Sequence, residues 1–401
     1  MTGTERQPAG GVGGADGAPG APPSGSSGGD RVLSVSSTAL FAIALGMVGV
    51  SAPLFAVQVG ISAALVGALV ALAGVSQVAT RLCMGPLLRR FPDKFFVVLA
   101  ATALTVSCVL LVLAAQIWAF AASQLLQGAA RALFWTGSQT HAVRAWRTAV
   151  GGLSVINIAN GAGSLVGPAL AGLLAARSLD LSLLVAAAVC LAGVGPGGLL
   201  ARFPPFQPDR DRGGVGRLWQ RPGVDAACAM TAGGGAWKGL MNSYVPVLLS
   251  QAGHAAPVVG VVVTGANAAA LLGSAVSRWV QRLGVRRSVL LGVVPTGLAL
   301  ALAGLLADHL AAAATALAVA GGGAGVLQTV GPGLAADSVG PEERGDAIAT
   351  IGTFRAATLL AAPLGVGALV LALPVGAALT VAGVLIVVPS TVALRRAGPA
   401  N

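Results

Sequence analysis

The sequence predicts an all-α membrane protein with twelve transmembrane helices in two six-helix halves. The first observation is composition, because 55% of the 401 residues are hydrophobic and 9% are charged, whereas soluble domains carry roughly 25% charged residues. The second observation is that apolar runs of membrane-spanning length recur along the whole chain. The third is one long polar interruption, residues 203–223, which divides those runs into six and six. Together these observations exclude an ordinary soluble protein.

Twelve apolar runs have the length that a transmembrane helix needs, which is about 20 residues. Because a backbone in lipid finds no water to bond, each run must satisfy its own hydrogen bonds and is expected to be helical. The predicted helices cover residues 36–57, 64–88, 95–115, 118–139, 149–175, 181–201, 224–249, 257–280, 288–307, 311–335, 347–371 and 374–394.

The segments around these runs predict the domain organisation. Residues 1–30 are rich in Gly, Ala, Pro and Ser and lack the apolar core of a signal peptide, which predicts a disordered cytoplasmic tail. Residues 31–203 and 224–396 are expected to form the N-terminal and C-terminal six-helix halves. Between them, residues 204–223 are expected to form a central cytoplasmic loop.

The net charge of +11 invites a nucleic-acid partner, but its distribution argues against one. If both termini lie in the cytoplasm, the cytoplasmic turns and termini hold nearly all the Arg and Lys outside the helices. The opposite turns hold only Arg177. This is the positive-inside bias of membrane proteins. It predicts a multi-pass protein of the plasma membrane with both termini cytoplasmic, in contact with the lipid bilayer and with no nucleic acid.

A short basic turn occurs twice, each time between two apolar runs. Residues 85–94 read Gly-Pro-Leu-Leu-Arg-Arg-Phe-Pro-Asp-Lys, and residues 277–287 carry Arg at matching positions. A repeat of this kind indicates a duplicated membrane domain. The turn resembles the loop between the second and third helices of the major facilitator superfamily, with Arg89 where that family usually has Asp. The positions that match the family are Gly85, Leu87, Arg90 and Lys94.

Two further motifs resemble this family. Leu126-Gln127-Gly128 is similar to the Leu-Gln-Gly of its fourth helix, and residues 163–172 are similar to the glycine–proline motif of its fifth helix. Small residues spaced by four also let helices approach closely, so we interpret the second motif as packing. The resemblance implies a secondary transporter whose halves rock around a midplane site, bordered by helices four, seven and eleven.

Three cations remain inside the predicted helices, namely Arg131, Lys238 and Arg355. A charge near the bilayer centre costs at least ~2.5 kcal/mol, so such residues usually face a water-filled space and serve a function. Helical spacing adds Gln127 to the face of Arg131 and Asn242 to the face of Lys238. These five residues form the predicted substrate-binding site.

No Asp or Glu falls in the middle third of any predicted helix, and the histidines, expected to be solvated loop residues, lie near helix ends. They are His141, His254 and His309. Three midplane cations without an acidic partner need a counter-ion. The substrate is therefore expected to be a small anion. Two alternatives remain open: a proton-linked exporter of drug-like or amphiphilic compounds, and a non-transporting receptor or assembly protein on the same scaffold.

Catalytic patterns are absent from the sequence. It has no Ser/His/Asp arrangement, no metal-ligand spacing among its four cysteines and no phosphate-binding Gly-Lys-Ser/Thr loop. The chain is therefore expected to be a monomeric transporter rather than an enzyme, with no cofactor.

The basic turn also predicts a gate. In the family, the Asp that Arg89 replaces is thought to lie beside the start of helix eleven when the inner gate is closed. Here acidic residues precede and open that helix, so Arg89 could close the gate by pairing with Glu342, Glu343 or Asp346. The alternative is that Arg89 is one more positive-inside charge. The predicted gating residues are Gly85, Arg89, Arg90, Glu343 and Asp346.

Overall fold

The computed structural model describes residues 28–113, 116–146, 149–205, 218–340 and 343–396, and the regular structure in these ranges is entirely helical. The helices are α1 (Gly28–Gln58), α2 (Ala63–Arg90), α3 (Asp93–Leu113), α4 (Ile117–Ala145), α5 (Ala149–Ala175), α6 (Leu179–Ala192), α7 (Val194–Leu199), η1 (Leu218–Gln220), α8 (Val224–Met241), α9 (Tyr244–Gln251), α10 (Ala256–Gln281), α11 (Val285–Leu305), α12 (Leu310–Asp337), α13 (Arg344–Leu369) and α14 (Val375–Arg396).

The predicted all-α membrane architecture is confirmed. Nine segments of the described chain are long and apolar enough to cross a membrane, and α6 with α7 counts as one of them. The other three predicted runs fall on α4, on α8 with α9, and on α14, whose apolar part is shorter, Val375–Val388. Two of these runs, α4 and α8, carry residues predicted to form the binding site.

Two of the predicted helices are interrupted, which sequence periodicity did not indicate. Helix α6 ends at Ala192, and α8 ends at Met241 beside its cap residue Asn242. Helix α6 ends four residues before Pro196, and α8 ends five residues before Pro246. A proline ring clashes with the carbonyl four residues earlier and removes a backbone donor, so the helix breaks there.

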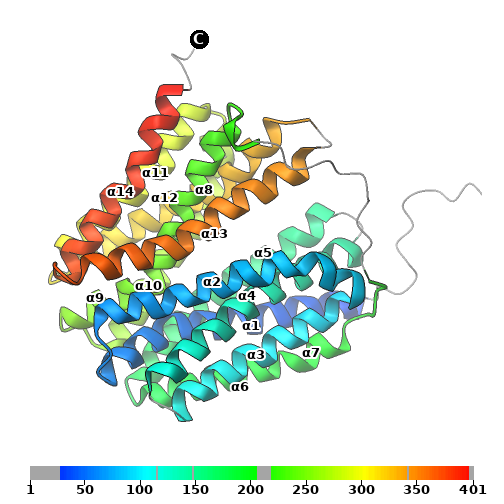
Figure 1. The fold of residues 1–401 in the computed structure, drawn as a ribbon, viewed down its shortest axis with the longest axis horizontal. Coiled ribbons are helices and arrows are strands. Elements are labelled where there is room, and N and C mark those ends of the chain that lie inside the picture. Colours follow the sequence, from blue (N-terminus) through cyan, green and yellow to red (C-terminus); the bar gives the residue numbers. More distant parts are fainter. Residues whose placement is uncertain (1–27, 114–115, 147–148, 206–217, 341–342, 397–401) are drawn as a thin grey trace, which may run out of the picture.

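The helices form two groups, α1–α7 and α8–α14 (Figure 1). In the first group α1 packs against α5, α2 and α3 against α4, and α3 against α6. The same pattern recurs in the second group, where α8 packs against α13, α10 and α11 against α12, and α11 against α14. Equivalent helices therefore make equivalent contacts in the two halves.

Glycines allow the backbones within each half to approach closely. A Cβ added at Gly323 would lie 2.6 Å from Thr296 Oγ1 on α11, and the neighbouring Gly321 and Gly325 of α12 face the backbone of α10. The glycine run at residues 321–325 is therefore a packing element of α12. Close backbone approach stabilises helix pairs in lipid, where apolar burial alone gives little preference.

The contacts between the halves gather at one end of the bundle. Tyr244 Oη donates a 2.9 Å hydrogen bond to the carbonyl of Ala63. Gly172 of α5 meets Gly260 of α10 so closely that a Cβ at Gly260 would lie 2.8 Å from Gly172 Cα. Figure 1 shows the halves meeting here and diverging toward the starts of α5 and α13. We call that diverging end, which carries Arg89, Arg90, Arg144 and Arg221, the basic end.

A buried acid–histidine cluster at the basic end corrects one prediction. His141 is fully buried, not a solvated loop residue. Its Nε2 lies 3.0 Å from Asp30 Oδ2 and its Nδ1 lies 3.3 Å from Asp93 Oδ2. The prediction failed because the partners come from α1 and α3, far from His141 in the sequence. Helix α1 also begins at Gly28, within the segment predicted as a tail, whose residues 1–27 lie outside the described part.

The cluster also holds the chain that leaves α7. The backbone N–H of Ala201 donates to Asp30 Oδ1 (2.7 Å), and Arg144 Nη2 donates to the carbonyl of Pro204 (2.7 Å). Lys94 Nζ donates to the carbonyls of Gly198 and Leu200, which would otherwise be left open at the end of α7. The first half therefore fixes the start of the connection to the second, while residues 206–217 of the predicted loop lie outside the described part.

Gly260→Val should force α5 and α10 apart at the end where the halves meet. The new side chain would lie 2.5 Å from the carbonyl of Pro168, and overpacking of this kind costs roughly 1–3 kcal/mol. Distances between spin labels at Ala176 and Ala255 should lengthen. Gly265→Val is the matched control, because nothing lies within 4 Å of a Cβ there. An unchanged distance distribution in Gly260→Val would contradict this account of the contact.

His141→Ala should lower the midpoint of thermal unfolding, because it removes the imidazole that lies between two buried acidic side chains. A buried polar group that loses its partner costs roughly 1–3 kcal/mol. Thermal unfolding of the protein in detergent, followed by tryptophan fluorescence, measures the change. The exposed His309 provides the control, since His309→Ala removes no buried contact. Equal midpoints for the two variants would show that the cluster does not stabilise the fold.

Candidate functional site

Arg131 lies on α4 and is partly buried. Its Nε atom is inaccessible to solvent and has no hydrogen-bond partner among the described residues. Burial of a guanidinium nitrogen without an acceptor costs free energy, so such a group usually bonds to a ligand or to water. The sequence places this arginine fourteen residues after the start of α4, well inside the span.

Lys238 lies in the last turn of α8, just before the proline-induced interruption. Its Nζ donates a 3.2 Å hydrogen bond to Asn267 Oδ1 on α10, and Asn267 in turn donates to the carbonyl of Val263 (3.0 Å). The free carbonyls at a helix C-terminus carry about half a negative charge and favour a cation nearby. Lys238 therefore lies at the end of α8 that favours a cation.

Arg355 lies on α13 and is exposed. Its Nη2 donates to Gln328 Oε1 on α12 at 3.4 Å. Behind it, the backbone of α13 packs tightly against Gly235 of α8, where an added Cβ would meet Thr358 Oγ1 at 2.6 Å. Gly235 of α8 therefore serves helix packing, whereas Lys238 contacts α10.

The structure brings the three predicted cations together. Lys238 lies within electrostatic range of both Arg131 and Arg355, although they come from helices α4, α8 and α13. None of the three forms an ion pair with a carboxylate in the described part of the chain. Both hydrogen-bonded cations contact neutral amide oxygens, which orient the charge without cancelling it.

The two polar residues predicted beside these cations have other contacts. Gln127 Nε2 donates to Ser123 Oγ (3.1 Å), and Ser123 bonds Ser107 on α3, so this amide joins the packing of α3 on α4. The side chain of Asn242 lies against α1, where a Cβ at Gly49 would be 3.3 Å from Asn242 Oδ1. Asn242 therefore lies at a contact between the halves, one turn beyond Lys238.

The predicted gating residues lie at the basic end. Glu343 accepts two hydrogen bonds from Arg221, at 2.6 and 3.0 Å, and both side chains are accessible to solvent. Hydrogen bonding by Arg221 holds the pKa of Glu343 below its usual value, so the pair persists at neutral pH and is lost as the pH falls through that lowered value. Arg89 and Arg90 are exposed at the end of α2. The side-chain surroundings of Gly85 and Asp346 lie outside the described part.

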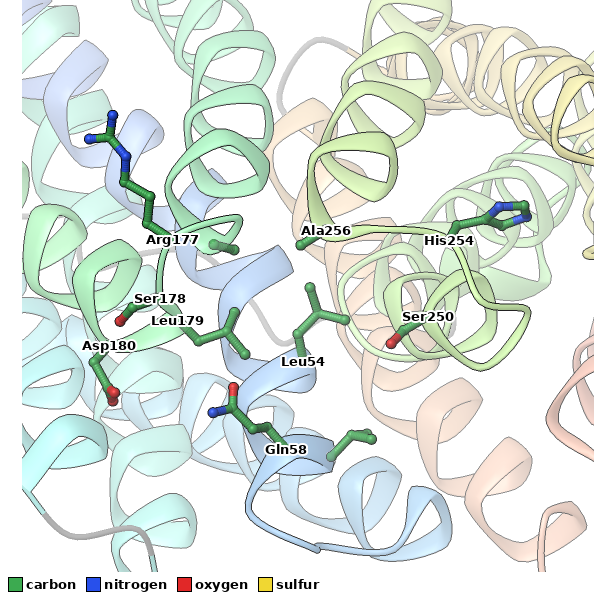
Figure 2. A pocket seen from close by; sticks show the side chains of 11 residues that line it. Leu54, Gln58, Arg177, Ser178, Leu179, Asp180, Ser250, His254 and Ala256 are labelled. Atoms are coloured by element: carbon green, nitrogen blue, oxygen red, sulfur yellow. The ribbon is translucent and has the colours of Figure 1, made fainter.

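A separate pocket of about 420 Å³ lies at the opposite end of the bundle, between the halves. It is lined by the end of α1, the turn from α5 to α6 and the turn from α9 to α10 (Figure 2). Leu54 and Leu179 face Ala256 across it, while Arg177 and Asp180 extend in opposite directions from their turn. The pocket is distinct from the three cations.

Sequence reasoning did not assign Asn267 and Gln328 to the site, although both were visible as polar residues in apolar runs. It also counted Arg81 of α2 among the loop charges, whereas Arg81 lies within electrostatic range of Arg355. A polar residue in one span gives no indication of which other span it contacts. Among the described residues, no group of three or more His, Cys, Asp or Glu could hold a metal ion.

Comparison with known proteins gives the same fold. The chain resembles the solved structure of the nucleoside transporter NupG, with a TM-score of 0.73 and 13% identity over 93% of this chain and 99% of that one. A bacterial homologue of the human lysosomal transporter Spinster gives 0.71 and 12% over 92% and 94%. A POT family transporter in complex with 5-aminolevulinic acid gives 0.71 and 12% over 92% and 96%.

These likenesses and the helical architecture define a membrane protein with a transporter fold. The family model of the Major Facilitator Superfamily matches residues 35–276. The chain belongs to this superfamily, as its basic turn and fourth-helix motif predicted. A sequence comparison with curated proteins found no match.

Proposed function

We propose that this protein carries a small anion across the plasma membrane by alternating access, with Arg131, Lys238 and Arg355 as the binding cations. The observation that carries this proposal is the pairing of Lys238 with Asn267 and of Arg355 with Gln328. A charged residue within a membrane domain usually pairs with an opposite charge or with backbone carbonyls. Here the partners are neutral amides, so the positive charge stays available to a substrate.

The cations come from both halves, which suits alternating access. Arg131 belongs to the first half, whereas Lys238 and Arg355 belong to the second. Without a substrate their charges repel one another and oppose approach of the halves. A bound anion attracts the cations of both halves and outweighs their mutual repulsion, so it favours closure around the site.

The distribution of arginine supports an orientation with the basic end in the cytoplasm. Both termini then lie in the cytoplasm, and Tyr244, Gly172 and Gly260 seal the outer side. In this orientation the described conformation opens inward. An anion that enters from the cytoplasm would pass the exposed Arg355 before it reaches the more buried Lys238. An anion that leaves to the cytoplasm would pass the same two residues in the reverse order.

A proton-linked exporter is the second candidate, and the buried cluster of His141, Asp30 and Asp93 favours it. These protonatable groups lie at the basic end of the first half, near the ends of α1, α3 and α4. The solved relatives do not decide the substrate, since one is described as a nucleoside transporter and another holds 5-aminolevulinic acid. A proton-linked exporter exchanges compound for H⁺, so a rise in the luminal pH of proteoliposomes that accompanies uptake of an uncharged compound would favour the exporter.

Lys238→Ala and Arg355→Ala should abolish anion uptake into proteoliposomes while the protein still folds. Lys94→Ala is the matched control, because Lys94 is the only other lysine and bonds backbone carbonyls at the basic end. The measurement is uptake of radiolabelled anions by purified protein. Wild-type uptake by both site variants would exclude the anion site.

Asn267→Asp tests the role of the amide partner. The substitution keeps the shape of the side chain but places a carboxylate where the Asn267 oxygen lies 3.2 Å from Lys238 Nζ. An internal ion pair should lower anion affinity by about tenfold or more, since charge-assisted hydrogen bonds are about twice as strong as neutral ones. Thermal stabilisation by a series of anions measures this affinity. Unchanged stabilisation would argue against Lys238 as an anion ligand.

The gate proposal pairs Arg89 with the acidic start of α13 when the basic end closes. In the described conformation Glu343 pairs with Arg221 instead. An exposed pair contributes about 0–1 kcal/mol, enough to bias two nearly balanced states. Arg89→Asp should therefore impair transport, and adding Glu343→Arg or Asp346→Arg should restore part of it. Harmless Arg89→Asp, or failure of both rescues, would leave Arg89 as a topology charge.

A further inference from the structure

Arg81 lies on the face of α2 that turns toward α13. Two glycines define this face, because a Cβ at Gly67 would lie 2.6 Å from the carbonyl of Pro363 and one at Gly74 would lie 2.8 Å from Leu360 Cβ. Arg81 follows Gly74 by seven residues, as Gly74 follows Gly67. Seven residues are close to two helical turns, so all three positions share one face.

Arg355 precedes Leu360 by five residues on α13, and α2 and α13 run in opposite directions (Figure 1). Moving along α2 from Gly74 to Arg81 therefore means moving along α13 from Leu360 toward Arg355. The two arginines lie within electrostatic range of each other, and both are exposed because the helices diverge toward the basic end. Arg81 is thus a fourth cation beside the three of the proposed site.

The four cations divide evenly between the halves. Arg81 and Arg131 come from the first half, and Lys238 and Arg355 come from the second. In the described part of the chain none of them forms an ion pair with a carboxylate, and Arg131 Nε is buried without a partner. A ligand with one negative charge would leave three of these four charges uncompensated, including those of the partly buried Arg131 and Lys238.

Building on the proposed function, we infer that the substrate is an organic anion with at least two negative charges, bound between Arg81 and Arg131 of one half and Lys238 and Arg355 of the other. The guanidinium groups of the first half offer a planar fork that matches a carboxylate or phosphate. The cations of the second half are held in place by Asn267 and Gln328. A dianion engages both halves at once and favours their closure, whereas a monoanion satisfies one half.

The test compares succinate with butyrate, which have four carbons each and differ by one negative charge. Binding to the purified full-length protein is measured by thermal stabilisation and by competition in proteoliposome uptake. Succinate should bind about tenfold more tightly or better, the gain expected from a second charge-assisted contact. Glycerol phosphate forms a third arm, because both of its charges lie on one group. Tighter binding of glycerol phosphate than of butyrate also supports the inference.

Arg81→Gln isolates the fourth cation. It should weaken succinate binding by about fivefold or more while leaving butyrate binding within about twofold, since one charge contact is lost. Arg286→Gln is the control, an exposed arginine at the start of α11 on the basic end, and it should change neither affinity. Arg81→Lys keeps the charge and should retain most of the preference for succinate.

Two outcomes overturn the inference. Butyrate that binds wild-type protein as tightly as succinate and glycerol phosphate removes the requirement for two charges. Equal loss of succinate and butyrate binding in Arg81→Gln, with the unfolding midpoint of the free protein unchanged, removes the selective role of Arg81. If no anion stabilises the wild-type protein, the proposed anion site itself fails, which is a different result from binding without preference.

Discussion

A charge inside a membrane-spanning helix costs at least about 2.5 kcal/mol. The contacts that this protein makes to its intramembrane cations offset that cost, and the organisation of the site follows from them. Lys238 lies beside a helix C-terminus created within the span, and Asn267 orients it. Arg355 has Gln328. Neither arrangement adds a negative charge, so the site keeps a net positive charge that an anionic ligand can neutralise.

The basic end handles its buried charges differently. There His141 lies between Asp30 and Asp93, and Asp30 also accepts from the backbone of the chain that leaves α7. In this cluster the imidazole lies between two acidic side chains and a backbone donor binds one of them, as expected of groups that stabilise a fold. The cations around Lys238 contact no carboxylate among the described residues, and this contrast separates structural residues from candidate binding residues.

Close backbone contacts at small residues determine where the halves meet. The contact of Gly172 with Gly260 joins α5 to α10, and the contact of Gly67 with Pro363 joins α2 to α13. Glycine removes the side chains that would hold the helices apart. The same α2 and α13 diverge farther along, and that divergence leaves Arg81 and Arg355 exposed. Packing at one end thus positions the charges toward the other.

The sequence by itself determined the features that depend on local composition. Spans follow from the apolarity of about 20 consecutive residues, and the positions of Arg131, Lys238 and Arg355 within them are equally local. The basic turn around Arg89 and Arg90, its place between two spans and the fourth-helix motif together predicted the superfamily. The prolines that break two helices were also visible, but their effect requires knowing that the carbonyl four residues earlier is displaced.

Only the tertiary structure decided which residues meet. Burial of His141 depends on Asp30, 111 residues away in the sequence, and the partner of Lys238 comes from the next long helix. No periodicity within one helix specifies its contacts with another, because those contacts depend on how all the helices pack together. Single spans therefore show which residues belong to the site, whereas the contacts that balance or leave unbalanced their charges form only when the helices pack together.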